Sequence, residues 1–372
     1  MATVYEQRRA RVASLLKKHN VEMFFVSDPV NVGYLSGFTG GDSFLMVGRE
    51  GRVMLLTDGR FETFLKEEIP DLPIYVRKTG EKFSDALTKA TRGFFPRKSS
   101  GSYAVESGTI PLRMFSLIES VLNKTAVPVS GAIETLRMKK DRTEITAIRR
   151  SARAAIEGFR TIQARLQGSW SEIDLRNELD YQMRRAGADD VSFPTIVAVG
   201  SRAALPHAEP TAKLISEGES VLVDWGAKYQ GYASDLTRVL FTRKKISKKL
   251  VDIYNIVLKA QQAAISIIRP DITAGEVDRA ARQVIEDAGY ARYFNHGLGH
   301  GLGLAIHDAG SFSVGNDLLL RPGMVMTVEP GIYLPGRLGV RIEDDVLVTP
   351  NGVEVLTRSL SGSFDEMFAP LP

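Results

Sequence analysis

The sequence predicts an α+β protein of two domains, in which a smaller α/β N-terminal domain precedes a larger α+β domain. Three observations predict this. The length of 372 residues allows about two domains. The first third alternates helical and strand patterns, whereas from about residue 140 pairs of long helical segments precede strand pairs that contain acids. We place the boundary in the stretch "SGAIETLRMKKDRTEI", giving domains of 1–132 and 133–372.

In the N-terminal domain, apolar spacing predicts a helix over residues 5–19, followed by a buried strand in "VEMFFVS". The next stretch, "DPVNVGYLSGFTGG", is rich in turn residues and is expected to be a loop. "SFLMVGREGRVMLLTD" has two apolar runs around "GREG", which is typical of a hairpin. Strands and helices are expected to alternate to about Val129.

The larger domain is expected to begin with a long helix over 142–166, capped by Asp141 or Thr143. Further helical and strand segments follow at these positions: helices over 172–186, 247–268 and 274–289, a strand in "PTIVAVG", and strand pairs over 221–241 and 325–349.

Composition excludes several kinds of site. There are no cysteines, so disulfides, thiolate zinc sites and cysteine nucleophiles are excluded, and any metal must be held by oxygen and imidazole ligands. The net charge is +4, and the densest basic run, "RKKISKK", lacks aromatic residues; we expect a solvated helix start there and no nucleic-acid partner. The N-terminus lacks a signal-peptide pattern and the chain lacks a long apolar run, so we expect a cytoplasmic protein without a membrane partner.

Two pairs of acids stand inside apolar strand patterns. Asp224 and Asp235 are 235 − 224 = 11 residues apart around a midpoint at 229–230, so a hairpin there would set them roughly opposite each other. Glu329 and Glu343 are 343 − 329 = 14 residues apart around the turn-rich "LPGRLG". Like charges opposite each other are destabilising, and buried unpaired carboxylates cost more still. The pattern therefore predicts at least one divalent cation, and more readily two, between the acids.

Histidines are concentrated in "NHGLGHGLGLAIHD", residues 295–308, which holds three of the five in the chain. Its glycines argue against a helix and suggest a backbone that runs close to other groups. It lacks the G-x-x-x-x-G-K-[ST] pattern of a phosphate-binding loop. His300 is a natural fifth ligand beside the four acids. Such a set suits manganese, cobalt, iron or zinc, with two ions about 3.5–4 Å apart if carboxylates bridge them.

These residues and their motifs resemble one known family. The motifs "DWGAKYQGYASDLTR", "HGLGHGLGLAIHD", "TVEPGIY" and "GVRIEDD" are similar to those of the dimetal peptidases of the pita-bread fold, which include methionine aminopeptidase, aminopeptidase P and prolidase (Xaa-Pro dipeptidase). The N-terminal "DPVNVGYLSGFTGG…LLTDGRF" resembles the creatinase-type domain. That domain disfavours methionine aminopeptidase, and the intact ligand positions disfavour a creatinase.

The resemblance implies a role for each site residue. Asp224 would bind one metal, Asp235 and Glu343 would bridge two, and His300 and Glu329 would complete one metal's shell. Glu329 would also accept a proton from the attacking water. The remaining assignments are an oxyanion-stabilising contact with the scissile carbonyl for His307, substrate binding and proton shuttling for His207 and His296, and binding of a substrate carboxylate for Arg341. Asp308 stands where many relatives have glutamate.

The resemblance also implies an activity and cofactors. We expect a homodimeric enzyme with two divalent ions, manganese first and cobalt, zinc or iron as alternatives. It would hydrolyse the bond before proline in Xaa-Pro dipeptides through a metal-bridging hydroxide. The compact length and the short interval between Glu329 and Glu343 favour a dipeptidase. Three alternatives stay open: an aminopeptidase P acting on longer proline-containing peptides, a hydrolase of a non-peptide substrate, and a catalytically inactive protein-binding module.

Overall fold

The computed structural model describes residues 2–95, 101–243, 245–369 and 371, and the chain divides into two compact units. The units are Met1–Arg137 and Met138–Pro372. The boundary that we placed from the sequence, after residue 132, lies at the start of helix α6 (Ala132–Met138), near the end of the first unit. Each unit is described separately below.

The N-terminal unit is a six-stranded sheet with helices on its faces. The strand order is β4-β3-β2-β1-β5-β6, in which β2 is antiparallel to its two neighbours and the other pairs are parallel. Its elements before α6 are α1 (Val4–Lys18), β1 (Met23–Val26), α2 (Pro29–Ser36), β2 (Phe44–Gly48), β3 (Val53–Asp58), α3 (Glu62–Glu68), β4 (Ile74–Arg77), α4 (Phe83–Ala90), β5 (Ser102–Glu106), α5 (Leu112–Leu122) and β6 (Thr125–Val129).

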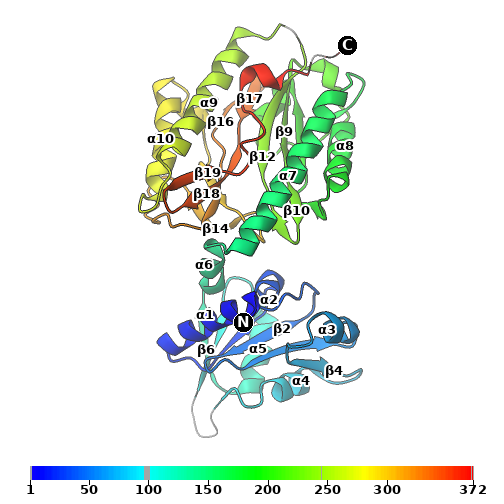
Figure 1. The fold of residues 1–372 in the computed structure, drawn as a ribbon, viewed down its shortest axis with the longest axis vertical. Coiled ribbons are helices and arrows are strands. Elements are labelled where there is room, and N and C mark those ends of the chain that lie inside the picture. Colours follow the sequence, from blue (N-terminus) through cyan, green and yellow to red (C-terminus); the bar gives the residue numbers. More distant parts are fainter. Residues whose placement is uncertain (1, 96–100, 244, 370, 372) are drawn as a thin grey trace. The chain divides into compact units, whose positions relative to one another are not determined.

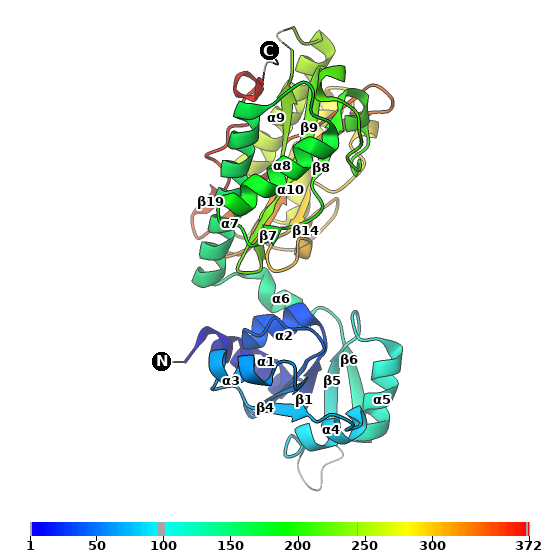
Figure 2. The same cartoon turned by 90° about the vertical axis from the view of Figure 1, so that its right-hand side faces the viewer.

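Alternation along β1 separates two layers of this unit. Met23 and Phe25 are buried in one cluster with residues of α4 and α5, such as Leu87 and Ile118. Because successive strand residues point to opposite faces, the intervening Phe24 faces the other layer. Figure 2 shows α5 and α1 at separate faces of the sheet. The predicted first helix, first strand and hairpin are confirmed by α1, β1 and β2–β3.

The expected loop over residues 28–41 is wrong in its first half, because residues 29–36 form α2. The Asp28 side chain accepts hydrogen bonds from Val30 N and Asn31 N, Pro29 occupies the first turn, and Gly37 ends the helix with φ +81°. Asp, Pro and Gly are turn residues, but here they are an N-cap, a first-turn proline and a C-cap glycine. The residues that begin and end this short helix are the same residue types that form turns, which is why the sequence predicts a loop here.

The C-terminal unit has curved antiparallel sheets between two pairs of helices. Figure 1 shows α7 and α8 on one side of it and α9 and α10 on the other. The elements are α7 (Arg142–Arg165), α8 (Glu172–Arg185), β7 (Asp190–Val191), β8 (Ile196–Val199), β9 (Ser220–Trp225), β10 (Ala227–Tyr229), β11 (Tyr232–Ala233), β12 (Leu236–Phe241), α9 (Lys248–Ile267), α10 (Ala274–Asp287), β13 (Gly299–Gly301), β14 (Asp308–Phe312), β15 (Val325–Val328), β16 (Gly331–Leu334), β17 (Leu338–Arg341), β18 (Asp344–Thr349) and β19 (Gly352–Val355).

All four predicted helices of this unit are confirmed. Asp141 is the N-cap of α7 and forms a capping box with Glu144, so Asp141 rather than Thr143 caps the helix. The basic run ends where α9 begins at Lys248; Lys244 lies outside the described residues. Trp225 is fully buried, stacks on Phe159 of α7 with ring centroids 4.2 Å apart, and thereby joins the first sheet to its helices.

The register of the first acidic hairpin decides where its two aspartate side chains lie. Gln230 and Gly231 form the first turn with positive φ, and Asp224 pairs with Thr237 rather than with Asp235. Asp235 therefore lies two residues from the position opposite Asp224. Because side chains alternate with a period of two, both still face the same side of the sheet. The expectation that they lie roughly opposite is thus corrected to diagonal neighbours, because the turn is centred one residue later than the midpoint.

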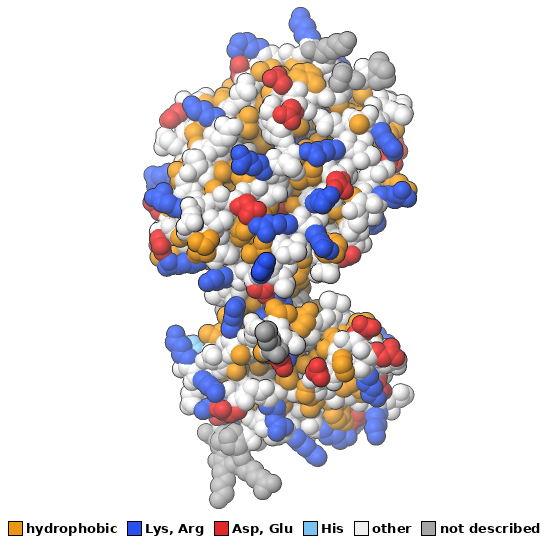
Figure 3. Space-filling view, in the orientation of Figure 1, with side chains coloured by type: hydrophobic (Ala, Val, Ile, Leu, Met, Phe, Trp, Pro, Cys, Tyr) orange, Lys and Arg blue, Asp and Glu red, His pale blue; other side chains and the backbone are white. Residues whose placement is uncertain are grey.

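Basic and acidic side chains are interspersed on the face of the C-terminal unit drawn in Figure 3. Among the helices that the structure describes, none combines the length and the apolar character needed to cross a membrane.

We predict that Gly226→Ala destabilises the C-terminal unit. A Cβ at Gly226 would lie 1.9 Å from the carbonyl oxygen of Ser234 and 2.2 Å from Ser192 Oγ, so the hairpin backbone would have to move. Overpacking of this kind costs about 1–3 kcal/mol in the free energy of unfolding, measurable by urea denaturation. Gly362→Ala is the control, because its Cβ would meet its nearest neighbour at 3.4 Å; equal stability of the two variants would contradict the prediction.

Candidate metal centre

One cavity of about 1090 Å³ in the C-terminal unit collects the residues singled out from the sequence. Its walls come from both acidic hairpins, from the histidine-rich segment and from the loop after β8. The candidate residues that line it are Asp224, Asp235, His300, Glu329, Glu343, His207, His296, His307 and Arg341. Segments more than 130 residues apart in the chain therefore meet at one place.

Asp235, His300 and Glu343 form the tightest group. Each offers one ligand atom, and these atoms all lie within 4.8 Å of one another, as they would around a metal ion. His300 Nε2 lies 3.5 Å from Asp235 Oδ2 and 3.5 Å from Glu329 Oε1. Its Nδ1 lies 3.1 Å from the Gly301 carbonyl oxygen, which can only accept, so Nδ1 carries the proton. In a neutral imidazole with the proton on Nδ1, the lone pair is on Nε2, the nitrogen that lies beside the carboxylates, and this is the form in which imidazole binds metals.

Thr237 joins the two acidic hairpins. Its carbonyl oxygen accepts a hydrogen bond from Glu343 N at 3.1 Å, and its Oγ1 donates to Glu343 Oε2 at 2.6 Å. Thr237 is also the strand partner of Asp224. One fully buried residue thus fixes Glu343 of the second hairpin relative to Asp224 of the first.

Arg341 is engaged with the acids themselves. Its Nη2 donates to Asp224 Oδ2 at 2.5 Å, its Nε to Thr237 Oγ1 at 3.0 Å, and its Nη1 to Tyr333 Oη at 3.0 Å. A guanidinium at this position offsets part of the acidic charge and orients one oxygen of Asp224. The other oxygen, Asp224 Oδ1, is buried without a hydrogen-bond partner among the described residues, as expected of a ligand atom. Contact of Arg341 with a substrate carboxylate stays a prediction.

The acids are strongly desolvated. Burial, together with the charges of neighbouring carboxylates such as Asp224 and Glu329, raises the pKa of Asp235 and of Glu343 well above the usual values. Burial also raises the pKa of Glu329. These shifts show how poorly protein groups alone stabilise the charged carboxylates. Four carboxylates and one imidazole, with too little positive charge from the protein to balance the acids, form a ligand set that fits divalent cations.

Two of the histidines have distinct environments. His296 Nε2 lies 3.0 Å from Tyr333 Oη, and burial lowers the pKa of His296 to about 4, so its ring is neutral at neutral pH. The His307 ring packs edge-on against the His300 ring with centroids 4.3 Å apart. Partial desolvation of the ring and the neighbouring His300 also lower the pKa of His307, although the residue is open to solvent.

The glycines between the histidines are required by close backbone approach. A Cβ at Gly299 would lie 2.1 Å from the carbonyl oxygen of Thr327, and one at Gly301 would lie 2.1 Å from that of Ala309. Both glycines belong to β13, which pairs with β14 and β15, so the predicted absence of a helix is confirmed. Any larger residue would push His300 away from the acids.

Two family models match the chain. Residues 146–350 match metallopeptidase family M24, and residues 8–139 match the creatinase/prolidase N-terminal domain.

The chain belongs to metallopeptidase family M24. It is 32% identical to the Xaa-Pro dipeptidase of Pyrococcus furiosus over 359 residues, which cover 95% of this chain and 98% of that protein. The solved structure of the Xaa-Pro dipeptidase from Bacillus anthracis matches with a TM-score of 0.90 at 35% identity, covering 96% of this chain and 98% of that one. The X-Pro aminopeptidase of Thermotoga maritima matches with a TM-score of 0.85 at 33% identity, covering 92% and 97%.

These similarities confirm the fold expected from the sequence, a creatinase-type N-terminal domain followed by a pita-bread catalytic domain. They also confirm that this M24 protein is an enzyme, a metallopeptidase, and a divalent metal cofactor follows from the family. The inactive binding module is accordingly disfavoured.

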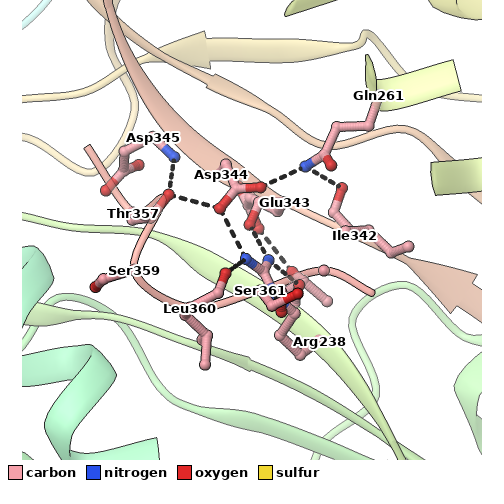
Figure 4. A network of polar contacts seen from close by, with 12 residues as sticks. Arg238, Gln261, Ile342, Glu343, Asp344, Asp345, Thr357, Ser359, Leu360 and Ser361 are labelled. Atoms are coloured by element: carbon pink, nitrogen blue, oxygen red, sulfur yellow. Dashed lines mark hydrogen bonds and ion pairs between the residues drawn. The ribbon is translucent and has the colours of Figure 1, made fainter. Parts of the chain in front are cut away.

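Several residues that support the M24 site were not predicted from the sequence. Figure 4 shows Arg238 of β12, fully buried, with Nη1 donating to the Glu343 carbonyl at 2.6 Å and Nη2 to Asp344 Oδ1 at 2.8 Å. Gln261 of α9 donates to Asp344 Oδ2 at 2.9 Å. Asp345 Oδ2 accepts from the backbone N of Asp235 at 3.1 Å. Arg238 lies in the motif "DWGAKYQGYASDLTR" and Asp344 and Asp345 lie in "GVRIEDD", whereas Gln261 lies mid-helix without any sequence signal.

We predict that the metal-free M24 protein loses stability as the pH rises. The folded-state pKa of Asp235 is raised above its ordinary value of 3.8, so this group favours folding below that value. The contribution is lost as the pH rises from 3.8 through the raised pKa, because the folded carboxyl must then ionise in a buried acidic site.

Asp235→Asn removes this titration, so the chelator-treated variant should exceed the chelator-treated wild type in Tm by an amount that grows with pH. Differential scanning calorimetry over a pH series measures it, with Asp252→Asn, a partly exposed acid paired with Lys248, as the control. A Tm difference that is constant or shrinks with rising pH would contradict the assignment.

Proposed function

We propose that this M24 peptidase hydrolyses the peptide bond before proline in Xaa-Pro dipeptides. The observation that carries the proposal is the convergence of four carboxylates and His300 in one cavity that His296 and His307 also line. Relatives that share about a third of their residues over nearly the whole chain are named Xaa-Pro dipeptidases, which supports the choice of substrate. The ligand roles of Asp224, Asp235, His300, Glu329 and Glu343 are part of the proposal.

Two divalent ions, when bound by these residues, supply Lewis acidity and lower the pKa of water. The side chains of the chain perform the remaining tasks. Glu329, whose pKa is raised, accepts the proton of the attacking water. His307 donates a hydrogen bond to the oxygen that gains charge as the carbonyl carbon becomes tetrahedral. His296, held by Tyr333, and His207 bind the substrate and pass the proton to the leaving amine.

An aminopeptidase that removes the first residue from longer Xaa-Pro peptides is the second candidate. The observation in its favour is the match to the X-Pro aminopeptidase of Thermotoga maritima over most of both chains. Initial rates on an Xaa-Pro dipeptide and the matching Xaa-Pro-Yaa tripeptide separate the two, and a higher kcat/KM for the tripeptide would replace the first assignment by the second.

Manganese and the homodimer belong to the same proposal, and the cytoplasmic location stays a prediction from the sequence. We expect purified protein to lose activity on dialysis against a chelator and to recover it with manganese, and with cobalt, zinc or iron to different extents. Metal content by mass spectrometry should then approach two ions per chain. A chelated protein that keeps full activity would contradict the metal requirement.

We predict that Asp235→Asn lowers kcat/KM for the dipeptide by more than about 10²-fold, because a neutral amide would hold a divalent cation more weakly than a carboxylate, and even residues that support a metal ligand are worth about 10- to 100-fold. Bound metal per chain should fall in parallel. Asp252→Asn, a partly exposed acid in the same unit, should leave both unchanged. Wild-type activity in Asp235→Asn would refute the ligand assignment, whatever the substrate.

A further inference from the structure

A buried ion pair lies next to the segment that carries His307. Lys140 Nζ is 3.6 Å from Asp308 Oδ2, and both side chains are only 1% exposed. Burying either charge without the other would be costly. The proposed reaction uses neither group, so the pair needs another explanation. Asp308 directly follows His307 in the chain, which suggests what the pair does.

Asp308 and His307 face opposite sides of the chain. Asp308 is the first residue of strand β14, and the burial of the two neighbours differs: Asp308 is buried and His307 is exposed. The Asp308 carboxylate is buried towards Lys140, whereas the His307 residue is exposed and lines the cavity. Holding the carboxylate in the interior therefore turns the imidazole towards the cavity.

The rest of the His307 segment has little regular structure of its own. Residues 302–307 lie between β13 and β14, outside any helix or strand. The carbonyl oxygen of Gly303 accepts from Ala233 N at 2.8 Å. A Cβ on Gly303 would lie 2.4 Å from Asp308 Oδ2 and 3.0 Å from Lys140 Cε, so this glycine gives the ion pair its space. Residues 302–307 therefore pack directly against the Lys140–Asp308 ion pair.

The backbone around Lys140 is held in place by neighbouring segments. Lys140 N donates to the Gly323 carbonyl at 2.9 Å, Lys139 forms a bridge with Met324, and the next residue, Asp141, caps α7. Lys140 is therefore fixed between the start of α7 and the residues that lead into β15. Backbone hydrogen bonds hold the segment at Leu302 and Gly303, and the Lys140–Asp308 pair holds its other end, next to His307.

We propose that Lys140 is a positioning residue for His307, acting through its ion pair with Asp308. The proposal rests on the role of His307 in the proposed function. Lys140 is buried and is not among the residues that line the cavity; it fixes the end of the segment so that the His307 imidazole points at the reacting carbonyl. Misplacement of a catalytic group by about 1 Å costs on the order of 10²-fold in rate.

The first test is Lys140→Met in the metal-loaded full chain. We expect kcat/KM for the Xaa-Pro dipeptide to fall about 10- to 100-fold, with bound metal unchanged because Lys140 is not one of the proposed ligands. Lys248→Met, the same change at an exposed ion pair with Asp252, should have no effect. Unchanged kcat/KM in Lys140→Met would overturn the proposal, while an inactive wild type would instead overturn the proposed function.

A double-mutant cycle separates positioning from general destabilisation. In a His307→Ala background, Lys140→Met should lower kcat/KM no further, because the residue through which it acts is gone. An equal loss in both backgrounds would show a purely structural role and overturn the proposal. If Lys140→Met does not fold, Lys140→Met/Asp308→Asn leaves neither charge buried and takes its place in the cycle.

Hydrogen exchange gives a readout that does not depend on activity. In Lys140→Met, amides of the peptide covering residues 302–309 should exchange faster than in the wild type, and those of β9 should not change. Protection of 302–309 equal to that of the wild type would contradict the positioning role even if activity fell.

Discussion

Mutual repulsion among four desolvated carboxylates is the constraint on which the C-terminal unit depends. Asp224, Asp235, Glu329 and Glu343 come from two hairpins, and each lies among apolar strand residues. No arrangement of apolar side chains can stabilise such charges, so the fold supplies oriented donors around them: the Arg341 guanidinium, the Thr237 hydroxyl and the Arg238 network behind Glu343. The carboxylates line the cavity, where the divalent cations proposed above would provide the missing charge.

The second requirement is that pieces distant in sequence hold one another at fixed places. Thr237 connects the hairpins through backbone and side chain, and Arg238, its neighbour, contacts the carbonyl of Glu343 on the opposite side. Alternate residues of one strand therefore serve the cavity and the layer behind it. The same division applies at His307 and Asp308, where one side chain faces the cavity and the next is anchored in the interior.

Much of the fold and of the site could be predicted because local patterns carried the information. Helix α7 has a capping residue and long apolar periodicity, and the acids of the hairpins are conspicuous among valines and leucines. Helix α2 could not be recognised because its eight residues are bounded by Asp, Pro and Gly, which also make turns. Gln261 and the Lys140–Asp308 pair could not be found because their partners are fixed only by tertiary packing. The diagonal placement of Asp235 depends on the turn at Gln230–Gly231, and a midpoint computed from spacing cannot give it.

The register of the first acidic hairpin limits which insertions and deletions it can accept. Between Asp224 and Asp235 the strands can gain or lose residues in pairs while both carboxylates keep facing the cavity, because the alternation has a period of two. A single inserted residue in β10 or β11 would have to be taken up as a bulge, because the pairing of Leu236 with Trp225 and the Thr237–Glu343 hydrogen bond hold the strand that follows Asp235 in place. Insertions of an even number of residues in this hairpin should therefore be tolerated better than insertions of an odd number, whatever their size.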